Sequence, residues 1–290
     1  MQGTVDGFTY GLVTPVTAFL MACLGAALGL RCTTRSLRTR GASRAGWLAL
    51  GATSIGSGIW TMHFIAMLGF TVREAPVSYD RPLTFASLAV AVVMVGIGIF
   101  LVGYRGATRM ALVTGGTITG LGVASMHYLG MAGMNFDGTF EYDTLTVSLS
   151  VVIAVVASTA SLWAAVSIHG FLPSLGASVV MGVAVSGMHY TGMAALQVHL
   201  HPGAAASGPG ETPTSLLLPM MIGPGCFLLL AAVVVMIDPL VVSGGPRAAA
   251  RPPGHTHRPG GPMTSIPVQR RPARPYETAS RRAFRQPRNR

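Results

Sequence analysis

The sequence predicts an all-α fold, namely a polytopic membrane protein with seven transmembrane helices and a threefold internal repeat of helix pairs. Three observations predict it. Half of the 290 residues are hydrophobic and only 10% are charged, whereas about a quarter of the residues in soluble proteins are charged. Seven apolar runs each have the roughly 20 residues that cross a bilayer. One segment of twelve residues occurs three times, at a nearly constant spacing.

The seven runs set the helices that we expect. Residues 1–10 contain Asp6 and no arginine, so they lack the basic start of a cleaved signal peptide, and we expect the first run to be a retained helix. Arg81-Pro82, Thr108, Asp143-Thr144 and Leu172-Pro173 are typical of helix starts. Pro219 and Gly223-Pro224 predict a kink in the last run. The expected helices are 11–30, 47–70, 83–103, 110–134, 144–168, 173–197 and 215–237.

Arginine sets the expected orientation and divides the chain into two domains. The connection over 31–44 holds five arginines and the third connection holds two, whereas the fourth holds three acidic residues and no base. Cytoplasmic connections are enriched in basic residues, so we expect a multi-pass protein of the cell membrane with its N-terminus outside and its C-terminus in the cytoplasm.

Residues 1–240 form the membrane domain. Residues 241–290, with eleven arginines and one acid, are expected to be a disordered basic cytoplasmic tail that can lie on anionic lipid. Nucleic acid is not an expected partner.

The repeated segment carries the chemistry. It spans 56–67, 120–131 and 182–193, and its histidines His63, His127 and His189 are 64 and 62 residues apart. In every copy methionine precedes the histidine, Phe or Tyr follows it, a small residue comes three later and methionine comes four later. Because positions four apart lie on one helical face, each histidine lies beside the second methionine of its copy. Small residues five and seven before each histidine allow helices to approach closely.

Three imidazoles and up to six thioethers can thus converge near the outer face of the membrane. Thioether with imidazole selects copper, especially Cu(I), over hard cations. Ionisable residues inside a membrane usually mark function. A histidine hydrogen-bonded between helices with methionine filling apolar gaps would suffice for one copy, but three copies at one depth favour a ligand site.

These segments resemble a known family. Met188-His189-Tyr190-Thr191 is similar to the signature of the bacterial MHYT domain, and Met62-His63-Phe64 and Met126-His127-Tyr128 resemble degenerate copies of it. The resemblance covers roughly residues 10–240. It implies an integral membrane sensor that binds copper and perceives oxygen, carbon monoxide, nitric oxide or a redox signal. The ligands that it implies are Met62, His63, Met67, Met126, His127, Met131, Met188, His189 and Met193.

Many members of that family carry a cytoplasmic domain that makes or degrades cyclic di-GMP, or a histidine kinase. We expect no such domain in this chain, so the signal would pass to an unidentified cytoplasmic partner. The expected partners are therefore the lipid bilayer, a diatomic gas and that signalling protein. No G-x-S-x-G, Walker loop, HExxH or carboxylate pair occurs, and we do not expect an enzyme.

Other functions stay open at this point. A copper or small-solute transporter would need ligands that continue toward the cytoplasm, where the helices that carry the motifs show methionine only as Met110 and Met181. A haem protein could use two of the histidines as axial ligands, but it would leave the repeated methionines without a role. A structural membrane protein would tolerate loss of all three histidines. His199 and His201 form an exposed H-x-H, which we interpret as a polar loop rather than a metal site.

Overall fold

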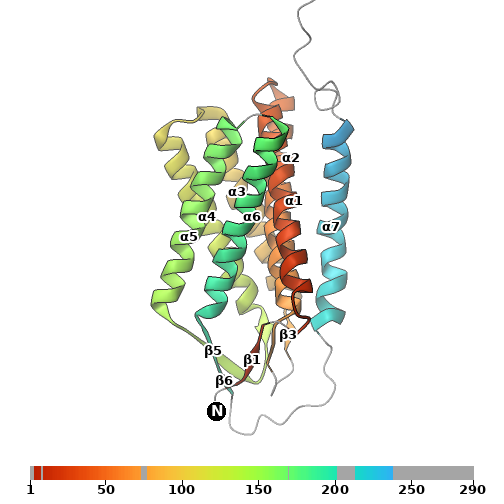
Figure 1. Cartoon of the computed structure of the whole chain (residues 1–290), viewed down its shortest axis with the longest axis vertical. Coiled ribbons are helices and arrows are strands. Elements are labelled where there is room, and N and C mark those ends of the chain that lie inside the picture. The colour runs from red at the N-terminus through yellow and green to blue at the C-terminus, as the bar shows by residue number, and fades with distance from the viewer. Residues whose placement is uncertain (1–2, 8, 73–76, 169, 201–212, 238–290) are drawn as a thin grey trace, which may run out of the picture. The chain divides into compact units, whose positions relative to one another are not determined.

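The computed structural model describes residues 3–7, 9–72, 77–168, 170–200 and 213–237. Seven long helices run side by side in this part of the chain (Figure 1). The all-α fold class is therefore confirmed. The helices are α1 (Val13–Ser36), α2 (Ala42–Leu68), α3 (Arg81–Arg105), α4 (Arg109–Ala132), α5 (Thr144–Ser167), α6 (Phe171–Ala194) and α7 (Pro213–Ile237).

Three helices begin where the sequence predicts, at a residue whose side chain caps the first turn. Asp80 accepts a hydrogen bond from the backbone N–H of Leu83, Thr108 caps α4 in the same way, and Asp143 caps α5. Such caps satisfy N–H groups that have no partner within the helix. Helix α7 continues without a break through Pro219 and Pro224.

The first connection is shorter than expected, because α1 continues to Ser36 and α2 already begins at Ala42. Hydropathy marks where the apolar run ends, but a helix satisfies its own backbone groups and can continue beyond that point. The arginines of this extension lie over aromatic rings. The guanidinium of Arg31 is 5.1 Å from the ring centre of Phe171, and that of Arg35 is 5.8 Å from Trp47. Such stacking stabilises the extended helix ends.

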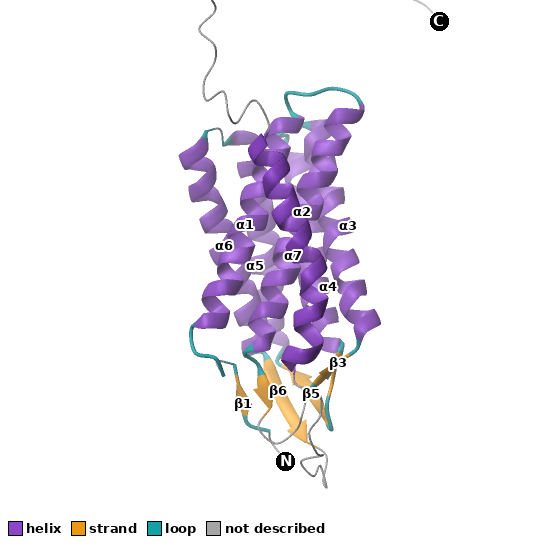
Figure 2. Ribbon diagram, turned by 90° about the vertical axis from the view of Figure 1, so that its right-hand side faces the viewer, coloured by secondary structure: helices purple, strands orange, loops and turns teal. Residues whose placement is uncertain are grey.

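Short strands that the sequence did not predict join the connections at one end of the bundle (Figure 2). They form three antiparallel pairs. Each pair joins segments far apart in the chain, so no hairpin pattern in the sequence predicts these strands. The pairs are β1 (Val5–Asp6) with β2 (Thr71–Val72), β3 (Ser78–Tyr79) with β4 (Met134–Asn135), and β5 (Gly138–Tyr142) with β6 (Leu196–Leu200).

Helices α1 to α6 pack in a closed ring in which each helix contacts the next and α6 contacts α1. Helix α7 packs against α1 and α2 outside this ring. The helices that carry the repeated segment, α2, α4 and α6, alternate around the ring and run toward the strand end (Figure 1). This arrangement agrees with a threefold repeat of helix pairs.

The first glycine of each copy lets its helix touch a neighbouring helix of the ring. A Cβ atom added there would lie too close to that neighbour, so a larger residue would push the helices apart. The distances from such a Cβ are 2.8 Å to the Cα of Val92 for Gly56, 2.5 Å to the Cα of Val155 for Gly120, and 2.5 Å to the Sγ of Cys23 for Gly182.

The outer surface of the bundle is apolar, as lipid contact requires. Large aliphatic side chains are exposed along several helices, among them Leu20, Val93, Val156, Val183 and Leu230. Five helices, α1, α3, α5, α6 and α7, are long and apolar enough to cross a membrane. Helix α2 is mostly buried inside the bundle, and neither α2 nor α4 reaches that hydropathy among the described residues. The protein therefore has the features of a multi-pass membrane protein, while the count of seven spans stays a prediction.

Two expectations lie outside the described residues. The basic tail over 241–290 is one of them, and His201 of the H-x-H pair is the other. Its partner His199 lies on β6, where its Nε2 is 3.0 Å from the carboxylate oxygen Oε2 of Glu141 on β5. The segment 196–200 is thus a strand, where we expected a helix up to residue 197 and then a loop.

Candidate metal centre

The three histidines of the repeat meet at one point inside the ring. Each lies five residues before the last residue of its helix, in α2, α4 and α6 respectively, so all three have one depth. Between 1% and 2% of each side chain is exposed. They are the one group of three potential metal-ligating histidine, cysteine or acidic residues found in the described part of the chain.

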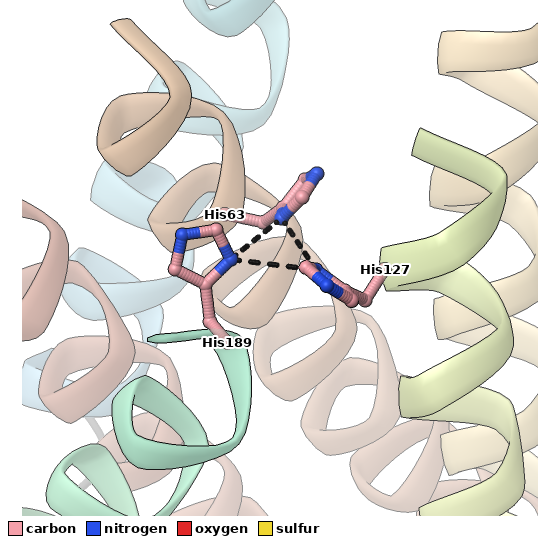
Figure 3. Close-up of side chains that lie close together, drawn as sticks. All are labelled: His63, His127 and His189. Atoms are coloured by element: carbon pink, nitrogen blue, oxygen red, sulfur yellow. Dashed lines mark hydrogen bonds between the residues drawn. The ribbon is translucent and has the colours of Figure 1, made fainter. Parts of the chain in front are cut away.

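The rings face one another through the same atom (Figure 3). The Nδ1 atom of His63 is 3.1 Å from that of His189 and 3.2 Å from that of His127, and the remaining pair is 3.4 Å apart. The ring planes are nearly perpendicular, at 81°, 87° and 89°. Three nitrogens therefore form a nearly equilateral triangle. We call this cluster of His63, His127 and His189 the histidine triad.

Hydrogen bonds among the rings cannot satisfy all three contacts. A neutral imidazole carries a proton on only one nitrogen, and the other nitrogen only accepts. Each of the three contacts needs one Nδ1 that donates and one that accepts. With three mutually adjacent Nδ1 atoms, at least one contact therefore joins two donors or two acceptors. A cation at the centre would instead meet three lone pairs at once. The triad therefore has the donor set of a metal centre.

The size of the triangle fits a transition metal. A point equidistant from the three Nδ1 atoms lies about 1.9 Å from each, which is their mean separation divided by the square root of three. Bonds from zinc to imidazole nitrogen are about 2.0–2.1 Å long, and imidazole also suits copper, iron and nickel. The three Nδ1 atoms are therefore spaced as the ligands of such an ion would be.

The other nitrogen of two rings lies against a glycine of the next copy. The Nε2 atoms of His63 and His127 are buried and have no hydrogen-bond partner among the described residues. A Cβ atom at Gly130 would lie 2.7 Å from Nε2 of His63, and one at Gly192 would lie 2.5 Å from Nε2 of His127. Each of these glycines stands three residues after a triad histidine. The sequence shows a small residue at this position in every copy, and that repetition is the signal by which its role could have been found.

The aromatic residue after each histidine supports the ring beside it. Phe64, Tyr128 and Tyr190 pack with their rings steeply inclined to the preceding imidazole, at centroid distances of 4.6, 4.8 and 5.0 Å. The hydroxyl of Tyr128 is also 2.7 Å from that of Ser150 on α5. These contacts restrict the orientation of the imidazoles.

The six methionines of the predicted ligand set lie on the same three helices. Five of them are buried, with at most 1% of the side chain exposed, and Met193 is half-buried. Coordination of a metal by these methionines stays a prediction. The buried methionines are Met62, Met67, Met126, Met131 and Met188.

Comparison with known proteins places these features in a family. Residues 56–115, 120–178 and 182–247 match the MHYT family, described as the bacterial signalling protein N-terminal repeat. The chain is 39% identical over 207 residues to the bifunctional diguanylate cyclase/cyclic di-GMP phosphodiesterase MucR of Pseudomonas aeruginosa, and this match covers 70% of the chain and 30% of MucR. No solved structure matches the chain.

Two further relatives show the same partial coverage. The chain is 34% identical to the cyclic di-GMP phosphodiesterase NbdA of the same organism, over 70% of the chain and 27% of NbdA. It is 31% identical to the signaling protein YkoW of Bacillus subtilis, over 66% of the chain and 24% of YkoW. The chain thus matches less than a third of the length of each relative.

Proposed function

We propose that this chain, which belongs to the MHYT family of bacterial signalling proteins, is a membrane sensor that holds copper at the histidine triad. In this proposal it perceives a diatomic gas (oxygen, carbon monoxide or nitric oxide) or a redox signal, and it relays the signal to a cytoplasmic partner. The observation that carries the proposal is the convergence of three buried Nδ1 atoms within 3.4 Å of one another.

Several features favour copper in a low oxidation state. His63, His127 and His189 would hold it through Nδ1, and the motif methionines offer soft thioether ligands on the same helices. A cuprous ion with neutral ligands brings one positive charge into a buried site, which costs less than a divalent ion. Bound copper would supply an open coordination position and a change of oxidation state.

The protein's own residues would keep water away from this centre and fix its shape. Phe64, Tyr128 and Tyr190 restrict the rings, and Gly130 and Gly192 allow the rings to approach. Because the ligands come from three different helices, a change in the ligand set would shift the positions of α2, α4 and α6 together. Such coupling of a site to helix positions is what a sensor needs.

The geometry supports this function better than the alternatives. A haem held by two histidines would have to fit its porphyrin between rings whose Nδ1 atoms are 3.1–3.4 Å apart. A transport path would need successive sites along the membrane, and the triad is the one group of three close histidine, cysteine or acidic side chains in the described segments.

The names of two relatives guide the choice of partner. MucR and NbdA are named for cyclic di-GMP chemistry, and the chain matches only part of each. We therefore propose a cytoplasmic cyclic di-GMP enzyme as the class of partner to test first.

Copper analysis of the purified protein tests the proposal. After loading under reducing conditions, we expect close to one copper per chain in the wild-type protein. The variant with His63, His127 and His189 all replaced by alanine should bind none, while His199→Ala, a histidine outside the triad, should bind as the wild type does. Equal copper in the triple variant and the wild type, at equal helix content, would contradict the proposal.

A further inference from the structure

A cavity lies inside the helix ring, separate from the histidine triad. Its volume is about 40 Å³, and its surface is almost wholly apolar. Residues from six helices, α1 to α6, contribute to its wall. Those that the argument uses are Ile55, Ile59, Ile99, Thr119, Ser161 and Val185.

The cavity lies next to the triad, on the side away from the strands. Ile59 precedes His63 by four residues, and Val185 precedes His189 by four. Positions four apart lie one above the other on a helical face, about 5.4 Å apart along the axis. Side chains on a helix also lean toward its N-terminus, so the imidazoles lean toward the cavity. The wall also includes Ile55 and Thr119, each eight residues before a triad histidine. A molecule in the cavity would therefore lie about one to two helical turns from the triad.

The lining selects an apolar occupant over water. A buried water requires two to four polar partners, and this wall offers scattered hydroxyls such as those of Thr119 and Ser161 on an otherwise apolar surface. The volume is several times the roughly 10–15 Å³ that one water requires. Apolar cavities in proteins stay dry and take up xenon or small hydrocarbons. The space suits a xenon atom or a molecule of two atoms.

Lipid offers a route to this space. Ser161 on α5 and Val185 on α6 line the cavity and are only partly buried, and these two helices are neighbours in the ring. Val183, two residues from Val185, is 59% exposed on the apolar outer surface. Small apolar gases concentrate in the hydrocarbon of a membrane, so the seam between α5 and α6 faces their source.

We propose that this cavity is a binding pocket for one small apolar molecule of the size of xenon or a diatomic gas. That a diatomic gas is the natural occupant rests on the proposed function, whereas the capacity to bind a small apolar molecule does not. The pocket would hold the gas beside the triad and so raise its local concentration at the sensing centre.

Xenon titration of the full-length, metal-free protein in lipid nanodiscs tests the pocket. With isoleucine δ-methyl groups labelled, we expect the shifts of Ile55, Ile59 and Ile99 to saturate as xenon pressure rises. Ile97, which is 45% exposed on the same helix as Ile99, reports lipid-dissolved xenon and should change linearly. A linear response at all four methyl groups would overturn the proposal.

A filled cavity gives the matched comparison. Val185→Phe should weaken the saturable response by roughly tenfold or more, because the added ring takes the space. Val183→Phe adds the same ring to the same helix on the lipid side and should leave the response unchanged. If Val185→Phe does not fold, Ala165→Leu, which also fills the cavity from a buried wall position, replaces it. An unchanged response in a folded filling variant would also overturn the pocket.

The metal-free titration separates this inference from the sensor function. Saturable xenon binding in a protein that takes up no copper would establish the pocket and contradict the metal centre. Stoichiometric copper with a purely linear xenon response would support the metal centre and contradict the pocket.

Discussion

Two histidines of the triad are placed by a contact that only a small neighbour allows. His127 packs with Nε2 against Gly192, as His63 does against Gly130, and the aromatic residue that follows each histidine flanks the ring. The position three after the histidine of one copy therefore seats the ring of the preceding copy. In this way the second copy positions the histidine of the first, and the third copy positions the histidine of the second.

Gly192→Ala tests this dependence at a single atom. The new Cβ would lie 2.5 Å from Nε2 of His127, so the ring must shift and the Nδ1 triangle must open. We expect the copper affinity to fall by roughly tenfold or more, as for other changes to residues that orient metal ligands. Competition with a copper chelator measures this affinity.

Gly187→Ala is the control on the same helix. A Cβ there meets no atom within 4 Å, so the copper affinity should equal that of the wild type. Equal affinity in both variants would show that the glycine contact does not position His127.

At this scale the sequence predicted the triad but not the way it is seated. The spacing of Met, His and Met in three copies predicted that His63, His127 and His189 lie together, because equal depth and a shared helical face follow from spacing alone. The choice of Nδ1 as the converging atom depends on rotamers and on which helix lies opposite Gly130 or Gly192. Those relations arise only when the helices are packed.

The helices form a ring because each copy of the repeat provides a flat patch for a neighbour. Gly56, Gly120 and Gly182 stand at the same position of their copies, and each contacts a different helix of the ring, α3, α5 and α1 respectively. Helix α1 thus occupies, beside α6, the place that α3 and α5 occupy beside α2 and α4. Helix α7 is left to pack on the outside.

Gly120→Ala should destabilise the ring at one seam. The added Cβ would lie 2.5 Å from the Cα of Val155, and backbone cannot yield as a flexible side chain does. We expect a loss of roughly 1–3 kcal/mol in the free energy of unfolding, the usual cost of overpacking. The thermal midpoint in detergent, followed by circular dichroism, measures it.

Gly176→Ala on α6 is the matched control, since a Cβ there meets nothing within 4 Å. It should leave the midpoint unchanged or raise it, because alanine favours a helix by about 0.5–1 kcal/mol over glycine. A midpoint for Gly120→Ala equal to that of Gly176→Ala would contradict the close packing of α4 on α5.

The helices could be predicted from apolar runs and capping residues, and the strands could not. Asp80, Thr108 and Asp143 precede helices in the sequence as they do in the structure. Each short strand, by contrast, pairs with a segment more than 50 residues away, as Val5 does with Val72. Such pairing depends on the bundle bringing the connections together, and nothing local in the sequence encodes it.

At the scale of the molecule, the strand end and the arginine end of the bundle differ in charge. At one end, the connection between α1 and α2 carries Arg38 and Arg40, and α4 begins at Arg109. The strands at the other end carry acids such as Glu141. The excess of arginine predicts that the arginine end of the bundle faces the cytoplasm. The triad lies nearer the strand end, so it would be nearer the outer face.

Labelling of introduced cysteines tests this orientation. In a background without Cys23, Cys32 and Cys226, we expect a membrane-impermeant maleimide to modify Thr139→Cys on intact cells, because Thr139 is exposed on β5. Arg40→Cys, exposed between α1 and α2, should react only after permeabilisation. The opposite pattern would invert the topology and place the triad near the cytoplasm.

X-ray absorption at the copper edge of the loaded protein tests the central claim most directly. The account predicts scattering typical of three imidazoles, with nitrogen at about 2.0 Å, in the wild type and in His199→Ala, and its loss in the triple alanine variant. Sulfur in the first coordination shell would add the motif methionines to the ligand set. Copper surrounded by oxygen alone, or an unchanged spectrum in the triple variant, would contradict a metal centre at His63, His127 and His189.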